Sequence, residues 1–334
     1  MRRRRVLALL LAAGASPGSL PSVAHAQPSA DQLLTEMRLS PADRQRVLSG
    51  EFVTGAVPAV SERDLSFAIA FLVKTSPESL AAQVVAGDLI TADAQVKAHG
   101  EIKGAGSLAD FAGLTLTADE ANALAGAKAG GALNLSAGEI SAFAGAPPAA
   151  AEQQLRTMLL ARYQAYRASG LAGIAPYDRG SGRTTDHAAD LRKASEATPG
   201  LKKYLPAFQA LLLGYPKAAV AQMRESFVWT RSVIEGRPTY ILTHVTAVAE
   251  GGARVIGRRQ YYASTGYNGE QSVAGFLPVQ GGAVVVVTSH AFTDQVAGFG
   301  GSMKRTIGSK VMESKMREIY EAGRTSAAGR KETR

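Results

Sequence analysis

The chain has 334 residues, 46% hydrophobic and 19% charged, which is the composition of a folded protein with a sizeable core. It has no cysteine, and this excludes disulfides, thiolate metal sites and a cysteine nucleophile. The formal net charge is +9, but without the four arginines at residues 2–5 only 33 basic residues face 28 acidic ones. No basic stripe is interleaved with aromatic residues, which argues against nucleic-acid binding. Weak contact with an anionic membrane surface stays open.

The first 26 residues have the three parts of a secretory signal peptide. Arg2 to Arg5 form a positive n-region, Val6 to Ala13 form a short apolar h-region, and Ala24-His25-Ala26 matches the A-x-A cleavage pattern. The apolar run is roughly half of the ~20 residues that a membrane span needs, which favours a cleaved signal over an anchor. We therefore predict cleavage near Ala26 and a mature protein that is periplasmic or secreted.

Two short helices are predicted after the signal, followed by a strand and a third helix. Apolar residues recur at helical spacing between residues 29 and 49, where Ser40-Pro41 is a helix start. The sequence DLSFAIAFLV at 64–73 is an apolar run of strand length. Ser76-Pro77-Glu78 then begins a helix that continues to about Val85.

Residues 100–213 are predicted to form a helical insertion. The sequences TADE at 117–120 and SAGE at 136–139 both match the capping box, in which a Ser or Thr side chain and a Glu three residues later satisfy each other's backbone amides. Longer helical segments are expected at about 149–169, 186–197 and 200–213.

The last third is predicted to be an antiparallel meander followed by one long helix. Four β-rich runs lie at 223–234, 239–249, 253–264 and 283–291. The turns between the first three are too short for parallel neighbours. In the helix, one apolar stripe recurs every four or five residues, and we expect it to pack on the sheet; it comprises Phe299, Met303, Ile307, Val311 and Met316.

Five segments carry a family resemblance through their hydrophobic patterns and turns. They are ERDLSFAIAFLVKTSPESL, DFAGLTLTADEANAL with LNLSAGEISAF, RPTYILTHVTAV, RRQYYAST and VVVVTSHAFTDQVAGFGGSMKRTIGSKV. In this order they resemble the START/SRPBCC-like superfamily of lipid- and hydrophobic-ligand-binding proteins, and more closely exported bacterial proteins of that layout. The resemblance implies an α+β helix-grip fold, in which an antiparallel sheet wraps around a long C-terminal helix beside an apolar cavity. It does not imply an enzyme.

The predicted organisation follows from these elements. A signal peptide at 1–26 and an N-terminal helical segment at 27–55 precede a helix-grip-like domain at 56–323. That domain is interrupted by the helical insertion at about 100–213, and a basic disordered tail follows at 324–334.

No catalytic or metal signature is present. Ser289, His290 and Asp294 are the most nucleophile-like group, but consecutive strand residues face opposite ways, so Ser289 and His290 are not expected to hydrogen-bond. There is no G-x-S-x-G elbow, no H-E-x-x-H and no close His/Asp spacing. We expect no catalytic residue, no metal ligand and no cofactor.

Polar and aromatic residues inside the meander are the candidate ligand-binding residues. Tyr240 and His244 share one face of their strand, Arg259 and Tyr261 share a face of the next, and Tyr262 lies on the opposite face. A few convergent polar groups in an apolar cavity are what a ligand site requires. The same residues equally fit an ordinary sheet surface, because the sequence does not show which face is concave.

The leading hypothesis is non-catalytic binding of a lipid or other hydrophobic small molecule. One alternative is a structural or partner-binding protein whose core is filled by its own side chains. Another is a cyclase- or hydrolase-like enzyme with His244 and a tyrosine as acid/base groups. A continuous apolar cavity favours the first, a filled core the second, and a buried polar pair in an open pocket the third.

Overall fold

The computed structural model describes residues 29–55, 57–87, 90, 92–218, 220–250, 252–298 and 300–329, with side chains up to residue 321. The expected signal peptide at 1–26 lies outside the described residues.

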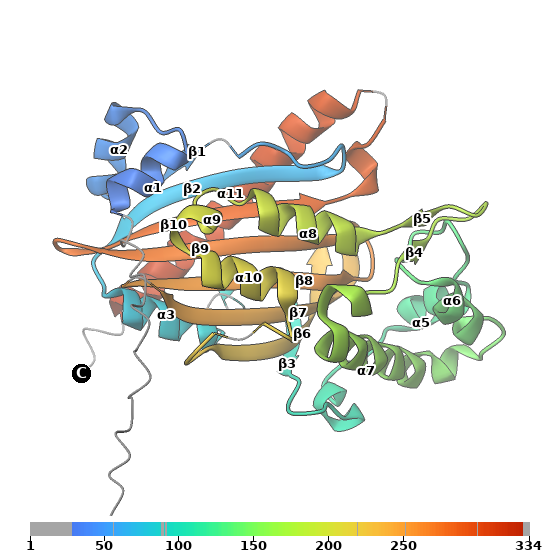
Figure 1. Cartoon of the computed structure of the whole chain (residues 1–334). Helices are drawn as coiled ribbons and strands as arrows, with labels where there is room; N and C mark the ends of the chain where they lie inside the picture. The colour runs from blue at the N-terminus through green and yellow to red at the C-terminus, as the bar shows by residue number, and fades with distance from the viewer. Residues whose placement is uncertain are drawn as a thin grey trace, which may run out of the picture.

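An eight-stranded antiparallel sheet is the centre of the molecule, with the strand order β1-β2-β10-β9-β8-β7-β6-β3 (Figure 1). Its strands are β1 (Val53–Gly55), β2 (Asp64–Val73), β3 (Val96–Glu101), β6 (Arg224–Ile234), β7 (Arg237–Glu250), β8 (Ala253–Ala263), β9 (Gly269–Val279) and β10 (Gly282–Phe292). A separate two-stranded sheet pairs β4 (Tyr177–Asp178) with β5 (Thr184–Thr185). The predicted antiparallel meander is confirmed.

Helices cover both faces of this sheet (Figure 1). The α-helices are α1 (Ala30–Glu36), α2 (Pro41–Leu48), α3 (Pro77–Val85), α5 (Ala118–Ala125), α6 (Ala137–Phe143), α7 (Ala151–Ser169), α8 (His187–Ala197), α9 (Leu201–Tyr204), α10 (Pro206–Gly214) and α11 (Gly301–Gly329). Short 3-10 helices lie at Leu108–Phe111, Pro148–Ala150, Gly170–Gly173 and Asp294–Val296. The fold is therefore α+β, as predicted.

The two faces have separate hydrophobic cores. One core lies under α3 and α11 and includes Phe67, Ile69, Phe276 and Met316; we call this side of the sheet the α11 face. The other lies under the helical insertion and includes Tyr166, Phe208 and Leu242; we call it the insertion face. Because strand residues alternate between faces, nearly every residue of the central strands is buried in one of these two layers.

Several predicted elements are confirmed at their predicted bounds. The apolar run at 64–73 is β2, and the helix after Ser76 is α3. Both predicted capping boxes form, one at the start of α5 and the other at the start of α6. Gly170 ends α7 with φ +57°, and a Cβ at this position would come within 1.9 Å of the Tyr215 carbonyl oxygen.

Three strands of the eight-stranded sheet were not predicted, and neither were the two short strands β4 and β5. β1 lies inside the segment predicted as purely helical, and β3 lies at the start of the predicted insertion. β3 pairs only with β6 at the sheet edge, and its sequence VKAHGE alternates partly buried and exposed residues without an apolar run. β9 contains Gly, Gln, Ser and Pro and becomes a strand through its pairing with β8 and β10.

The C-terminal helix corrects two predictions. It continues through residues 324–329, which we expected to be disordered, because these residues include good helix formers and no proline. The expected apolar stripe is not the packed side, since Met303, Ile307 and Val311 are exposed and only Met316 is buried. The helix contacts the sheet through Met312, Met316 and Tyr320 instead. Phe299 lies outside the described residues.

A buried histidine joins the insertion to the sheet. His187 begins α8, stacks on Tyr177 at 4.2 Å, and its Nε2–H donates to the Tyr261 carbonyl oxygen at 2.9 Å. Burial lowers the pKa of His187 to about 3, so its ring is neutral in the folded protein near neutral pH.

We predict a measurable pH dependence from this residue. The pKa of His187 is lower in the folded chain than its ordinary value of 6.5, so the unfolded chain binds the extra proton and stability falls as pH drops below about 6.5. Between about pH 7 and about pH 5 this group should remove about 2 kcal/mol from the free energy of unfolding. Chemical denaturation of His187→Gln should show a correspondingly smaller decrease in the free energy of unfolding between these two pH values. The exposed His99→Gln is the matched control, and equal pH slopes for His187→Gln and the parent chain would contradict the account.

Candidate functional site

A cavity of about 470 Å³ lies between the α11 face of the sheet and α11. Residues of β6 to β10 build its sheet wall, among them Thr230, Thr243, Gln260, Glu270 and Ala291. The helix wall comprises Gly308, Val311, Met312, Lys315, Met316 and Ile319. Small-molecule sites occupy roughly 300–1,000 Å³, so this cavity has the size of a ligand site.

Small side chains leave this space open. Thr230 and Thr243 line the cavity on two adjacent strands, whereas Phe71 and Phe276 fill another part of the same face. A threonine side chain extends much less far from the sheet than a phenylalanine. The cavity therefore follows from side-chain volume along the strands.

Gly308 sets how closely the helix approaches the sheet beside the cavity. A Cβ at this position would come within 2.8 Å of the Leu65 Cδ2 atom on β2. Both residues line the cavity, so this close approach bounds it on the β2 side.

Polar side chains from β8, β9 and the loop between them converge on the cavity. Glu270 is 7% exposed and accepts a hydrogen bond from Ser289 Oγ at 2.9 Å. Tyr267 donates its hydroxyl to Gln260 Oε1. Burial raises the pKa of Tyr267 well above its ordinary value of 10.0, so its phenol is a neutral donor.

Arg258 supplies the cavity with an unpaired positive charge. Its side chain is partly buried on β8, and its guanidinium makes no hydrogen bond or ion pair with any residue that the structure describes. Lys315, the cation on the helix wall, lies 3.1 Å from Glu318. An unpaired, partly desolvated guanidinium is disposed to bind a carboxylate or a phosphate.

The five predicted ligand-binding residues all lie on the insertion face, away from this cavity. Alternation places Ile241 and Thr243 of β7 toward the cavity and Tyr240 and His244 toward the insertion. Tyr240 donates to Glu120 Oε1 at 2.8 Å and so attaches α5 to the sheet.

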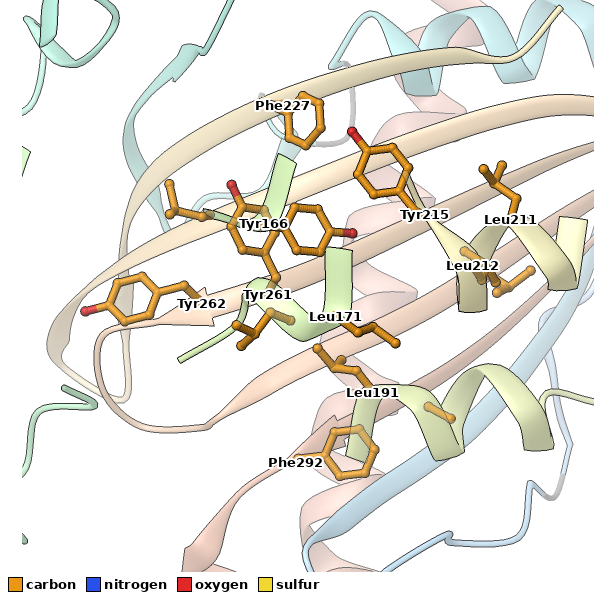
Figure 2. Packing of buried hydrophobic residues seen from close by; sticks show 14 of the residues in the cluster. Tyr166, Leu171, Leu191, Leu211, Leu212, Tyr215, Phe227, Tyr261, Tyr262 and Phe292 are labelled. Carbon is orange, nitrogen blue, oxygen red and sulfur yellow. The ribbon is translucent and has the colours of Figure 1, made fainter. Parts of the chain in front are cut away.

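Tyr261 and Tyr262 share a face, contrary to prediction, because of a β-bulge. Leu242 pairs with Tyr262 while the next residue pairs with Gln260, so Tyr261 is the extra residue and both tyrosines enter the same core. Figure 2 shows Tyr261 beside Tyr166, whose ring stacks on it at 4.1 Å, and Tyr262 nearby. The Arg162 guanidinium lies 4.2 Å from the centre of the Tyr262 ring.

A row of polar side chains crosses the sheet on the insertion face. Ser66, His290, Gln271, Arg259 and His244 pair in one register across five adjacent strands. None of them was expected to be adjacent from the linear sequence, because register between strands is fixed only when the sheet forms.

Arg259 makes the most contacts in this row. It donates to Gln271 Oε1 at 2.8 Å, to the Leu212 carbonyl oxygen at 2.7 Å, to Ser195 Oγ at 3.1 Å and to the Tyr166 hydroxyl at 3.3 Å. It is 3% exposed. These four bonds tie two strands to α7, α8 and α10.

His244 does meet a tyrosine, as the enzyme hypothesis required, but in an enclosed place. Its Nδ1 lies 3.1 Å from the Tyr166 hydroxyl and its Nε2 lies 3.1 Å from Glu225 Oε2. Burial lowers the pKa of His244, although Glu225 partly opposes the shift. The cavity beside this pair measures only about 10 Å³, enough for one water and not for a substrate.

The nucleophile-like group is dispersed, as the alternation of strand residues predicted. Ser289 donates to Glu270 on the α11 face, whereas His290 Nδ1 lies 2.8 Å from Asp64 Oδ2 on the insertion face. Asp294 lies 2.8 Å from the Arg179 guanidinium. These residues do not form a nucleophile with its base.

No group of three or more His, Asp or Glu side chains is arranged to hold a metal ion within the part of the chain that the structure describes. Among the same residues, no helix has the length and apolar character needed to cross a membrane.

Comparison with family models, with curated proteins and with solved structures gives no match.

The cavity residues were not predicted from the sequence for a specific reason. Alternation along β8 places Arg258 and Gln260 on the face opposite to Arg259, but the sequence does not show which face lies under α11. Gly308 followed four residues later by Met312 was the available signal, because a glycine on a helix permits close approach to a sheet.

We predict stability effects of very different size for two adjacent arginines. Arg259→Leu leaves several buried acceptors without their donor and should lower the free energy of unfolding by about 3 kcal/mol. Arg258→Leu removes a side chain with no partner among the described residues and should change it by less than about 1 kcal/mol. Urea denaturation of both variants tests this. Equal losses would contradict the assignment of the two faces.

Proposed function

We propose that this protein is exported and binds a lipid or other hydrophobic small molecule, without catalysis, in the cavity between the sheet and α11. The observation that supports this proposal is the cavity itself, which has a volume of about 470 Å³ and is bounded largely by apolar and small side chains. Burial of apolar surface contributes about 0.8 kcal/mol per methylene, so a guest with an alkyl chain would gain substantial free energy there.

Arg258 is the feature of the cavity that favours an amphiphile with an anionic head group, because it has no ion partner among the described residues. The acidic residues Asp93, Glu235 and Glu270 also line the cavity, and Glu270 accepts a hydrogen bond from the neutral Ser289 hydroxyl. A carboxylate or phosphate placed beside Arg258 would form a charge-assisted hydrogen bond in a partly desolvated site. The alkyl portion would then lie along Ile241, Met312 and Ile319.

The arrangement also supports the helix-grip interpretation as a proposal. An antiparallel sheet, an insertion on its other face and a long final helix bounding a cavity follow the order of elements that the resemblance implies. The alternative of a filled core is less consistent with a cavity of this size. The enzyme alternative has its His244–Tyr166 pair, but that pair has room for only about one water.

The first test is to fill the cavity. Ala291 is 2% exposed and lines the cavity from β10, so Ala291→Phe should occupy part of it and weaken binding of dodecanoate at least about tenfold. Titration calorimetry on the chain from residue 27 onward measures this. Ala291→Ser keeps the volume and is the matched control. Unchanged affinity in a folded Ala291→Phe protein would rule out this cavity as the binding site.

The second test addresses the head group. Arg258→Leu should weaken dodecanoate binding about ten- to hundredfold, since hydrogen bonds to charged groups contribute about 1.5–3 kcal/mol. Binding of dodecanol should change by less than about threefold, because dodecanol has no charge to lose. The exposed Arg237→Leu alters the net charge equally and should leave both affinities unchanged. An equal loss of affinity for dodecanoate and for dodecanol in Arg258→Leu would contradict the role of Arg258.

A further inference from the structure

The first half of the α11 helix has an exposed apolar stripe. Met303 is 71% exposed, Ile307 59% and Val311 57%, and they recur every four residues on one side of the helix. Of the described residues, only Leu48 and Leu108 are other large hydrophobic side chains with comparable exposure, and both are less exposed. A contiguous run of this kind is unusual on a surface that only faces water.

The opposite side of the helix packs against the rest of the molecule. Met312 and Met316 pack into the core of the α11 face, and Gly308 lies against Leu65. Arg305 points to the body of the molecule and donates to the Glu62 carbonyl oxygen at 3.0 Å. The stripe is therefore a second apolar face of the same helix, and no described residue covers it.

Lysines lie on both sides of this stripe. At about 100° per residue, Lys304 lies on one side of the line through Met303, Ile307 and Val311, and Lys310 lies on the other. Both are exposed and neither forms an ion pair with a described residue.

The acidic residues of the helix lie beyond the stripe. The sequence from 301 to 312 contains no Asp or Glu. Glu313 lies 3.9 Å from Arg317, and Glu318 lies 3.1 Å from Lys315. The half of the helix that has the stripe is thus positively charged.

We propose that this stripe and its lysines form a docking surface for an anionic phospholipid membrane. An apolar stripe about 12 Å long between basic residues matches a helix that lies in the membrane interface. The lysines provide attraction to anionic head groups, and the three apolar side chains enter the acyl boundary.

The cavity lies next to this surface. Val311 is exposed as part of the stripe and also lines the cavity, and Lys315 lines it one turn later. A molecule leaving the membrane would meet the cavity at the docking surface. This link to ligand uptake rests on the proposed function, whereas the docking itself does not.

The experiment is flotation of the chain from residue 27 onward with vesicles. The predicted signal peptide at 1–26 is left out because its apolar segment would itself bind lipid. The parent protein should float with equimolar phosphatidylcholine and phosphatidylglycerol, bind phosphatidylcholine alone at least about tenfold less, and dissociate in high salt. The triple variant M303S/I307S/V311S should lose at least about tenfold of the binding to anionic vesicles. The variant K304Q/K310Q should lose the preference for anionic vesicles.

Matched controls separate this surface from the rest of the molecule. L48S and L108S replace exposed leucines elsewhere, and K202Q/K217Q removes two exposed lysines elsewhere; all should bind as the parent does. Ala291→Phe should also float as the parent does, so loss of ligand binding and loss of docking are distinguishable. Absence of flotation, or equal loss in the control variants, would overturn the proposal. Sedimentation that shows a dimer abolished by the triple serine variant would assign the stripe to self-association and would also overturn it.

Discussion

The alternation of side chains along the central strands is the constraint on which the rest of the structure depends. Each residue of β6 to β10 faces either the helical insertion or α11, so adjacent residues belong to different cores except at the bulge, where Tyr261 and Tyr262 enter the same one. Arg258 and Arg259 show the consequence, because one faces a cavity without an ion partner among the described residues and the other makes four buried hydrogen bonds. A shift of one residue in register would exchange these two environments.

The two faces differ in how completely they are filled. On the insertion face, tyrosine rings stack and the polar row from Ser66 to His244 is enclosed by helices, which leaves space for about one water beside His244. On the α11 face, threonines and an alanine leave a volume suited to a small molecule. Aromatic packing and the four hydrogen bonds of Arg259 thus fix the insertion on the sheet, while α11 forms the helix wall of the space for a guest.

Local signals predicted most of the elements, and long-range signals were the ones missing. The capping boxes of α5 and α6 and the strand at 64–73 were predictable because their causes lie within a few residues. β9 was not, since its Gly, Ser and Pro residues form a strand only between two partners. The arrangement of the candidate site residues was not predictable for a similar reason, because the bulge at Tyr261 and the face covered by α11 depend on contacts between distant segments. The stripe of α11 was misassigned because both of its sides carry apolar residues.

The most direct test of the account is to locate a bound guest by isotope-filtered NMR. With labelled methyl groups and unlabelled dodecanoate, the ligand protons should show contacts to Ile241 and Met312, which line the cavity. They should show none to Leu211 and Leu212, which are buried on the insertion face. Contacts to the leucines without contacts to Ile241 and Met312 would contradict the central claim that the space between the sheet and α11 is the ligand site.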